Sequence, residues 1–544
     1  MSRSPLFASV HRALTIARAC DARRLSAEQG IALAREHELA SAARRSRREW
    51  LQTVGRAGAA AAVASIATPI ERLRASTSAP SAPSIGIVGA GLAGLACADA
   101  LAARGIVASL YEAGLRTGGR CFSLRGFFPQ QVGERGGEFI DTTHTTMLGY
   151  AKRFDLTLED VTKKAGDTTY YFDGEFVPET IIVDEFREFV AVMRHDLRRL
   201  SSEVTASSPT ADDVILDNTT LSAYLDGHNA AGVAAGPAAH AAITSAYQAE
   251  YGLETGEQSC LNFLMFIHAD RRSKFTPFGV FSDERYHVID GNDRIAEGLT
   301  QSLPRPVDLG RTLVAARRTS SGAIELSFET GTPATHDIVV LAMPFSVLRH
   351  VALDASLAIP IEQQTAIDTL GYGNNAKLLV GFDGRPWIGQ NSSGTAYSDL
   401  EHHQLTWETN RARASAARGV LTDYASGDRG FAMNPAAVQA EAEAFLSDFD
   451  LVFPGAAAVA SRRPDHSLVA HLEHWPSNPL TLGSYTCYRP GQFTTMAGLE
   501  GKPVENLYFA GEHANSFYDW QGFMEGAALS GLDVAAAILR AVRK

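Results

Sequence analysis

The chain has 544 residues, of which 45% are hydrophobic and 20% charged, and its formal net charge is −12. This length exceeds one ordinary hydrophobic core, so two or three packed units are expected, and the acidic balance argues against a nucleic-acid surface. The five cysteines are odd in number and lack C-x-x-C spacing, which argues against a disulfide framework and predicts no metal site. No uncharged apolar run of about 18 residues is present, so no membrane span is predicted.

Residues 1–83 are predicted to form a helical extension that ends in a linker. Ser26 and Gln29 match a capping box at the start of one of its helices. The segment Ser46–Gln52, SRREWLQ, is similar to the twin-arginine export signal, and a weakly apolar stretch follows at Val54–Ala67. Export to the periplasm or the medium is therefore expected. A basic helix end in a cytoplasmic protein is the alternative, because the arginines lie unusually far from the N-terminus and an arginine interrupts the apolar stretch.

A strand–turn–helix unit begins at Ile85. The apolar run Ile85–Val88 predicts a buried parallel strand, and the turn Gly89–Gly94, GAGLAG, has the G-x-G-x-x-G pattern. The first glycine permits a tight turn, the second lets the backbone approach a pyrophosphate, and the third lets helix and strand pack closely. The next strand, Val107–Tyr111, leads into Glu112, which can accept hydrogen bonds from ribose hydroxyls. This combination predicts dinucleotide binding, and a plain glycine-rich turn is the alternative.

Two more glycine motifs follow, and the pattern then changes. Arg116–Arg120, RTGGR, and Gly136–Asp141, GGEFID, would let the backbone lie close to a planar or charged group, although simple turns are the alternative. Beyond residue 150 the strand–glycine–helix pattern is lost. Helices are predicted at Pro178–Ser202, Thr219–Asn229 and Ala238–Tyr251, where an inserted domain would lie.

Strands return from residue 285 onward. Arg311–Arg317 and Ala323–Phe328 predict a hairpin. The apolar run Asp337–Leu348 predicts a fully buried strand of the nucleotide-binding sheet, which ends at Met343-Pro344. Lys377 begins an apolar strand, where lysine is uncommon, unless it reaches water from a sheet edge. The chain ends with a buried strand that runs into Gly511–Glu512 and a helix rich in small residues. This second cofactor approach implies a cofactor domain that is discontinuous in sequence.

In their order along residues 84–540, these motifs resemble those of the FAD-dependent amine oxidases, which include monoamine, polyamine and L-amino-acid oxidases. The resemblance implies a mixed α/β fold with a Rossmann-like FAD-binding domain (84–150, 285–350 and 475–544). A substrate-binding domain of mixed sheet and helices (151–284 and 351–474) is inserted into it. The residues expected to bind FAD are Gly89, Gly91, Ala93, Gly94, Glu112, Ala113, Arg116, Gly119, Arg120, Gly136, Gly137, Val314, Trp475, Gly511, Glu512, Phe523 and Met524.

The same resemblance assigns the residues beside the flavin. Lys377 corresponds to a lysine that hydrogen-bonds through water to flavin N5, which makes it the expected catalytic residue. Tyr485 and Phe523 correspond to the aromatic walls that flank the substrate amine, and Trp475 to a tryptophan beside the flavin. Ser484 stands where monoamine oxidases have the cysteine that binds flavin covalently, so FAD is expected to be non-covalent. Many members have an arginine near the pyrophosphate at the position of Gly114, and that contact is expected to be absent here.

The expected substrates are a small amine or amino acid and O₂. Many L-amino-acid oxidases have an arginine near the second glycine pair, whereas this chain has Glu138 and Phe139, which are predicted to line the substrate site. This difference favours a primary amine. An L-amino acid bound by Arg135 is the alternative, and Glu138 would either receive the distal ammonium of a polyamine or act as a buried capping carboxylate.

The expected reaction oxidises the C–N bond to an imine, which gives a carbonyl compound and ammonia, and reduces O₂ to H₂O₂. An NAD(P)-linked reductase and a non-catalytic flavoprotein are remote alternatives. The sequence leaves open whether the protein forms a homodimer.

Overall fold

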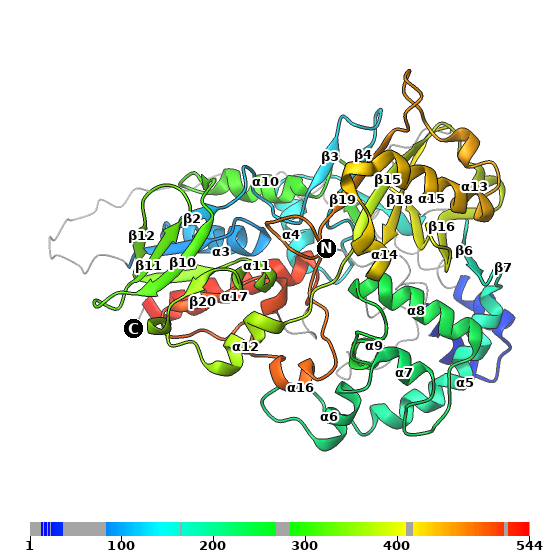
Figure 1. Ribbon diagram of the computed structural model, residues 1–544, viewed down its shortest axis with the longest axis horizontal. Helices are drawn as coiled ribbons and strands as arrows, with labels where there is room; N and C mark the ends of the chain where they lie inside the picture. Colours follow the sequence, from blue (N-terminus) through cyan, green and yellow to red (C-terminus); the bar gives the residue numbers. More distant parts are fainter. Residues whose placement is uncertain are drawn as a thin grey trace, which may run out of the picture.

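The computed structural model describes residues 12–14, 16–18, 20–21, 23–35, 83–163, 166–267, 283–409, 417–515 and 520–542. The twin-arginine-like segment Ser46–Gln52 and the apolar stretch Val54–Ala67 lie outside the described residues. Figure 1 shows two lobes, and each is organised around its own large sheet. In the described part of the chain, no helix combines the length and apolar character needed to cross a membrane.

The first lobe, which we call the FAD lobe, contains a five-stranded parallel sheet of order β20-β13-β1-β2-β9. Its strands come from three distant parts of the sequence, which confirms the predicted discontinuous Rossmann-like arrangement. All residues of β1 and β13 are buried, as expected for parallel strands covered on both faces. The bounds are β1 Ile85–Val88, β2 Ser109–Glu112, β9 Asp308–Leu309, β13 Ile338–Leu341 and β20 Leu507–Phe509.

Helices α3 and α17 pack against each other beside this sheet, although one begins the fold and the other ends it (Figure 1). Small residues allow the close approach, because a Cβ at Gly531 would fall 2.1 Å from the carbonyl oxygen of Ala93. The helices of this lobe are α3 Leu92–Ala102, α4 Thr145–Arg153, α10 Asp293–Ser302, α11 Phe345–Leu348, α12 Ile361–Thr369, α16 Gln492–Met496 and α17 Met524–Val542, with 3-10 turns η2 Ala355–Leu357 and η6 Glu512–Ala514.

A four-stranded sheet of order β12-β11-β10-β14 extends the FAD lobe and contains the predicted hairpin. Its bounds are β10 Leu313–Arg318, β11 Ile324–Phe328, β12 Ala334–His336 and β14 Ala352–Leu353, and small ladders join β3 Ser123–Arg125 to β4 Val132–Glu134 and β5 Leu158–Asp160 to β8 Tyr286–Val288. The buried strand that was predicted to end at Met343-Pro344 is present in the five-stranded sheet as β13, and it ends two residues earlier, at Leu341. The chain leaves the sheet after Leu341 and begins α11 after Pro344, whose fixed φ and missing N–H suit a helix start rather than a central strand.

The second lobe, the substrate lobe, is built on a seven-stranded sheet of order β19-β15-β18-β17-β16-β6-β7. Every residue of β15 and β18 is buried, so these strands form the core of the lobe. The strands are β6 Asp167–Phe172, β7 Glu175–Phe176, β15 Ala376–Phe382, β16 Ser392–Ser398, β17 Leu405–Glu408, β18 Gly419–Ala425 and β19 Ala470–His474.

Helices cover this sheet and extend below it in Figure 1, where α5 to α9 form a helical layer. The three helices predicted in this region are present as α5, α7 and α8, with α6 and α9 in addition. The bounds are η1 Val161–Lys163, α5 Glu179–Leu197, α6 Ala211–Asp217, α7 Leu221–Leu225, α8 Pro237–Tyr251, α9 Leu261–Ile267, α13 Pro386–Gly389, α14 Gly427–Ala432, η4 Pro435–Ala437, α15 Val438–Val452 and η5 Ala457–Val459.

The described part of the N-terminal extension, within residues 12–35, is helical and packs into the substrate lobe. The predicted capping box is confirmed, because Ser26 N–H donates to Gln29 Oε1 (3.0 Å) and Gln29 N–H donates to Ser26 Oγ (3.2 Å). Arg35 pairs with Asp167 of β6 at 2.9 Å. The apolar side chains on the inner face of the extension are buried in the same core as those of α5. They are Ala13, Leu14, Ile16, Ala17, Cys20, Ala27, Ile31 and Ala34.

Candidate active site

The predicted pyrophosphate site lies where β1 meets α3. Gly91 is the N-cap of α3, no side chain caps this helix end, and no acidic residue occupies its first turn. No atom lies within 4 Å of the position that a Cβ would take at Gly91, so the backbone there is open to a ligand. A Cβ at Gly94 would fall 1.9 Å from the oxygen of Gly89, which explains the third glycine. An exposed helix N-terminus favours an anion, so this cradle fits a pyrophosphate.

The predicted ribose and adenine contacts lie beside that cradle. The carboxylate of Glu112 accepts hydrogen bonds from the N–H groups of Ala90 and Gly114, each at 2.7 Å. Each oxygen retains a second acceptor site for a ribose hydroxyl. Val314 lies where the register of the β10–β11 ladder shifts, which suits the backbone contact that the resemblance implies. Ala113 follows Glu112 directly.

The two arginines of the RTGGR motif have different partners. Arg116 donates to the carbonyls of its own loop at Thr117 (3.1 Å) and Gly119 (2.6 Å), so it shapes that loop. Arg120 donates to the carbonyl of Ser484 (2.5 Å) and pairs with Glu512 at 2.9 Å. Burial opposes the ionised form of Glu512, but the charge of Arg120, the neighbouring His513 and the hydrogen bond from Arg120 act together with other positive charge to lower the pKa of Glu512. Arg120 therefore ties the predicted flavin-binding segments to one another.

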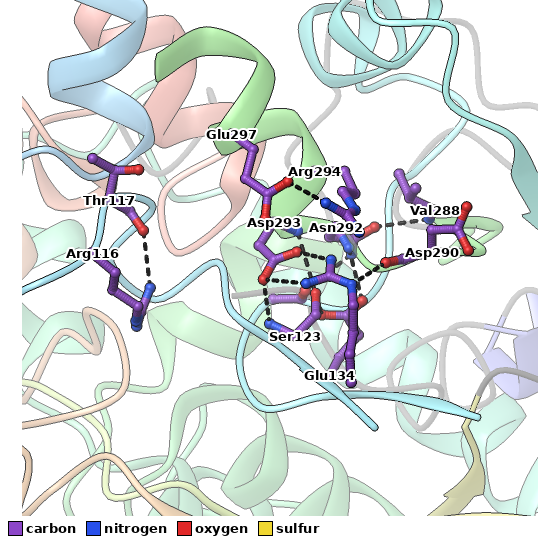
Figure 2. A network of polar contacts seen from close by, with 12 residues as sticks. Arg116, Thr117, Ser123, Glu134, Val288, Asp290, Asn292, Asp293, Arg294 and Glu297 are labelled. Atoms are coloured by element: carbon purple, nitrogen blue, oxygen red, sulfur yellow. Dashed lines mark hydrogen bonds and ion pairs between the residues drawn. The ribbon is translucent and has the colours of Figure 1, made fainter. Parts of the chain in front are cut away.

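Figure 2 shows a polar network that includes Ser123, Glu134 and Asn292, and this network also bonds to the backbone at the second glycine pair. The side-chain amide of Asn292 donates to the carbonyls of Gly137 (3.0 Å) and Glu138 (2.6 Å), while its backbone N–H donates to Glu134 (2.8 Å). Ser123 donates to the other oxygen of Glu134 at 2.8 Å. Sequence reasoning did not single out Asn292 or Glu134.

The glycine pair itself is enclosed on its other sides. A Cβ at Gly136 would fall 1.7 Å from the carbonyl oxygen of Arg120 and 3.2 Å from the Trp475 ring. A Cβ at Gly137 would meet the sulfur of Met524 at 2.7 Å. The indole of Trp475 also donates to the carbonyl of Arg135 at 3.0 Å. The structure thus brings together five residues that were predicted to touch the cofactor.

Lys377 lies on the central strand β15 and is buried, with 3% of the residue exposed. Its ammonium donates to the carboxylate of Glu138 (2.7 Å) and to the carbonyls of Gly136 (2.9 Å) and Glu134 (3.3 Å). An ammonium has three N–H donors, so protein acceptors are available for all of them. The alternative of an edge lysine that reaches water is therefore excluded.

Glu138 is paired with side chains and does not lie open to a substrate. One carboxylate oxygen accepts from Lys377 and the other from the indole N–H of Trp407 at 2.9 Å. This finding differs from the capping role considered above, because the partners are side chains rather than backbone N–H groups. Phe139 is buried beside the same tryptophan, with ring centroids 5.8 Å apart.

Both predicted aromatic walls, Tyr485 and Phe523, are buried. The hydroxyl of Tyr485 donates to the carbonyl of Ala249 (3.0 Å) and lies 3.1 Å from the hydroxyl of Tyr424. A Cβ at Gly522, next to Phe523, would lie 3.8 Å from the Tyr485 ring. Phe523 packs against His144, with ring centroids 5.1 Å apart.

The surroundings of Tyr424 are acidic, which sequence reasoning missed. Burial raises the pKa of Tyr424, the hydrogen bond with Tyr485 lowers it, and the negative charges of Glu250, Glu138 and Glu284 raise it further. Tyr424 lies directly opposite Lys377 in the β15–β18 ladder. That pairing could have been found only if the partner strand of Lys377 had been known.

The fold defined above is that of two-lobed FAD-dependent amine oxidases. Cyclohexylamine oxidase from Brevibacterium oxydans has a TM-score of 0.72 over 85% of this chain and 100% of that chain, at 20% identity. Putrescine oxidase bound to putrescine has a TM-score of 0.69 over 84% and 99%, at 19% identity. At such identities the likeness shows the fold alone.

The sequence model of the flavin-containing amine oxidoreductases matches residues 92–539, so the chain belongs to this family. Human amine oxidase B (flavin-containing) is 22% identical over 460 residues, 82% of this chain and 84% of the relative. Polyamine oxidase 4 of Oryza sativa subsp. japonica is 26% identical over 256 residues, and the match spans about half of each protein (46% of this chain and 48% of the relative). The predicted family and the FAD cofactor are thereby confirmed.

Proposed function

We propose that the chain is an FAD-dependent oxidase of primary amines. FAD supplies the redox chemistry, taking up two electrons from the amine and passing them to O₂. The amine loses two electrons and two protons and becomes an imine, whose hydrolysis gives a carbonyl compound and ammonia. The electrons and protons reduce O₂ to H₂O₂.

The charge around Tyr485 is the observation that carries this proposal. Its hydroxyl neighbour Tyr424 lies within the electrostatic influence of the buried carboxylates of Glu250 and Glu284, whereas the charge of Glu138 is balanced by Lys377. Negative charge in a desolvated site attracts an arriving ammonium and repels a carboxylate. An amine that lacks a carboxyl group therefore suits the site better than an amino acid.

The arginine considered as a carboxylate clamp is engaged elsewhere. Arg135 forms an ion pair with Glu473, and its guanidinium lies 4.0 Å from the centroid of the Phe122 ring. Moving it toward a substrate would leave Glu473, which is buried, without this partner. This arrangement further supports an amine over an L-amino acid.

The proposed roles of the chain's own residues follow from their positions. Tyr485 and Phe523 would hold the amine between their rings, and their burial would exclude water. Gly136 and Gly137 would let the flavin approach the backbone segment to which Lys377 donates a hydrogen bond.

The test is a substrate screen with the purified holoenzyme. Anaerobic addition of monoamines is expected to bleach the flavin, and aerobic addition to release H₂O₂, whereas the corresponding L-amino acids give neither. Matched pairs such as phenethylamine and L-phenylalanine isolate the effect of the carboxyl group. Bleaching by the amino acid alone would overturn the proposal.

A diamine or polyamine is the second candidate. The buried carboxylates of Glu250 and Glu284 would suit a second ammonium at a distance from the reacting amine, and two of the similar proteins are named polyamine oxidase and putrescine oxidase. A kcat/KM at least tenfold higher for diamines than for monoamines of equal length would favour this candidate.

We further propose that FAD is held non-covalently and that the protein is exported in folded form. Ser484 has a hydroxyl, which donates to Asn375 at 2.6 Å, where a thiol would be needed for attachment. Acid precipitation is expected to release all flavin into the supernatant.

The SRREWLQ motif supports twin-arginine export. Replacing both arginines, Arg47→Lys and Arg48→Lys, is expected to retain the protein in the cytoplasm, and unchanged fractionation would refute export.

A further inference from the structure

A buried ion pair connects the two lobes beside the predicted flavin site. Lys377 belongs to the substrate lobe and Glu138 to the FAD lobe, and their side chains are only 4% and 3% exposed. The ammonium also donates to the carbonyl of Gly136, so the lysine is directed at the backbone of the glycine pair. The positive charge of Lys377 therefore lies next to the backbone segment that is predicted to bind the cofactor.

The carboxylate partner is fixed as firmly as the lysine. Trp407 donates to the oxygen of Glu138 that Lys377 does not use, and the Lys377 ammonium lies 5.2 Å from the centroid of a Trp407 ring. A buried ammonium without a counter-charge tends to lose its proton, whereas a carboxylate in contact favours the charged form. Glu138 therefore supplies what a charged Lys377 needs in this position.

We propose that Glu138 is a positioning residue that keeps Lys377 charged and directed at Gly136, so that the lysine presents a fixed positive charge beside the flavin while O₂ is reduced. This role replaces the substrate-binding role predicted for Glu138 from the sequence. It rests on the proposed use of O₂, but not on the identity of the amine.

The chemistry of the oxidative half-reaction explains the need for such a charge. Two electrons pass from reduced FAD to O₂, and two protons complete H₂O₂. Negative charge reaches the oxygen before both protons do, and a preorganised cation stabilises that charge. Because the N–H groups of Lys377 have protein acceptors, the lysine contributes its field rather than one of its protons.

The test reduces the flavin with dithionite, which requires no amine, and then mixes the holoenzyme with O₂. The variants are Glu138→Gln, Lys377→Met and the double variant. Near pH 8, Glu138→Gln is expected to slow flavin reoxidation about tenfold. The double variant should be no slower than Lys377→Met, because Glu138 acts only through the lysine. Wild-type reoxidation in Glu138→Gln, or additive effects in the double variant, would overturn the proposal.

The pH profile of reoxidation separates this role from a merely structural one. Glu138→Gln should slow reoxidation more at high pH than at low pH relative to the wild type, because it removes the counter-charge that favours the charged form of the lysine. The other charged or titratable groups around the pair are Glu134, Arg135, Glu250, Glu284, Tyr424 and Glu473. A pH-independent loss in Glu138→Gln would contradict the proposal.

Thermal unfolding of the apoprotein gives a readout that needs no flavin. Glu138→Gln should lower the unfolding temperature by several degrees, and the double variant should recover most of that loss, because it removes both charges. Asp217→Asn is the matched control, since Asp217 is a buried carboxylate bound by Ser259 and Thr494. It should leave reoxidation unchanged. If the amine proposal fails in the substrate screen, these results still stand.

Discussion

The FAD lobe and the substrate lobe build their parts of the site in different ways. In the FAD lobe, short motifs set the backbone geometry. Gly91 leaves the N-terminal end of α3 open, and Glu112 accepts hydrogen bonds from backbone N–H groups close to it. In the substrate lobe, side chains meet only because strands pair, as with Lys377 and Tyr424 on β15 and β18. A cofactor site can therefore be predicted from a local motif, whereas the residues of a substrate site come together only through long-range topology.

The largest effect on FAD binding is expected where the FAD lobe depends on missing side chains. Gly136→Ala would place a Cβ 1.7 Å from the carbonyl oxygen of Arg120, a backbone atom that cannot easily move. We expect FAD content to fall more than tenfold, which corresponds to a loss of at least about 1.4 kcal/mol. The ratio of flavin to protein absorbance measures it. Gly149→Ala in α4, where a Cβ meets nothing within 4 Å, is the control and should load normally.

A large effect on the stability of the substrate lobe is expected from a substitution in the N-terminal extension that packs against it. Ile16 is 1% exposed in the core that also contains α5, so Ile16→Asp would bury an unpaired charge. We expect the free energy of unfolding of the substrate lobe to fall by about 4 kcal/mol. Denaturant unfolding measures it, with Ala32→Asp on the exposed side as the control. Equal stability of the two variants would show that the extension does not contribute to this core.

Glu500 provides a pH test of the FAD lobe. Burial raises the pKa of Glu500 to about 7, although hydrogen bonds from Tyr488 and the backbone oppose this shift. Because the folded state then binds the proton more tightly than the unfolded state, the contribution to stability is complete below about pH 4.5 and is lost as the pH rises through 7. We expect Glu500→Gln to gain up to about 3 kcal/mol relative to the wild type between pH 5 and 8. A difference that is constant with pH would contradict the raised pKa.

The smallest effect is expected at Tyr424, a residue of the substrate lobe whose hydroxyl lies near that of Tyr485. Tyr424→Phe removes the hydroxyl that lies 3.1 Å from that of Tyr485 and leaves the ring in place. We expect kcat/KM for an amine to fall about fivefold, equivalent to about 1 kcal/mol, with FAD content unchanged. A loss of FAD in this variant would mean that the two lobes are not independent in the way the comparison suggests.

The extent of sequence prediction follows the same division. The strand at Ile85–Val88, the glycine turn and the discontinuous sheet could be predicted because local spacing encodes them. The predicted end of β13 at Met343-Pro344 was two residues late, because an apolar run alone does not show where the hydrogen-bonded ladder of a strand stops.

The partners of Glu138 could not be predicted from local sequence. The residue was singled out because it follows the second glycine pair, in the segment where an arginine was expected, but its contacts lie on β15 and β17, more than 200 positions away. Likewise, nothing in the spacing of the sequence places Glu250 and Glu284 near Tyr424. Such constellations arise only when strands and helices from separate segments have been assembled.

The docked N-terminal helices have a consequence for biosynthesis. Their apolar face, which includes Leu14 and Ile16, reaches the ribosome exit before α5 has been translated. The ion pair between Arg35 and Asp167 spans 132 positions, so the cover for this face arrives late. Until then the nascent chain displays an uncovered hydrophobic surface. Slowing translation within residues 36–178 should therefore increase the demand for chaperones, and shortening that delay should relieve it.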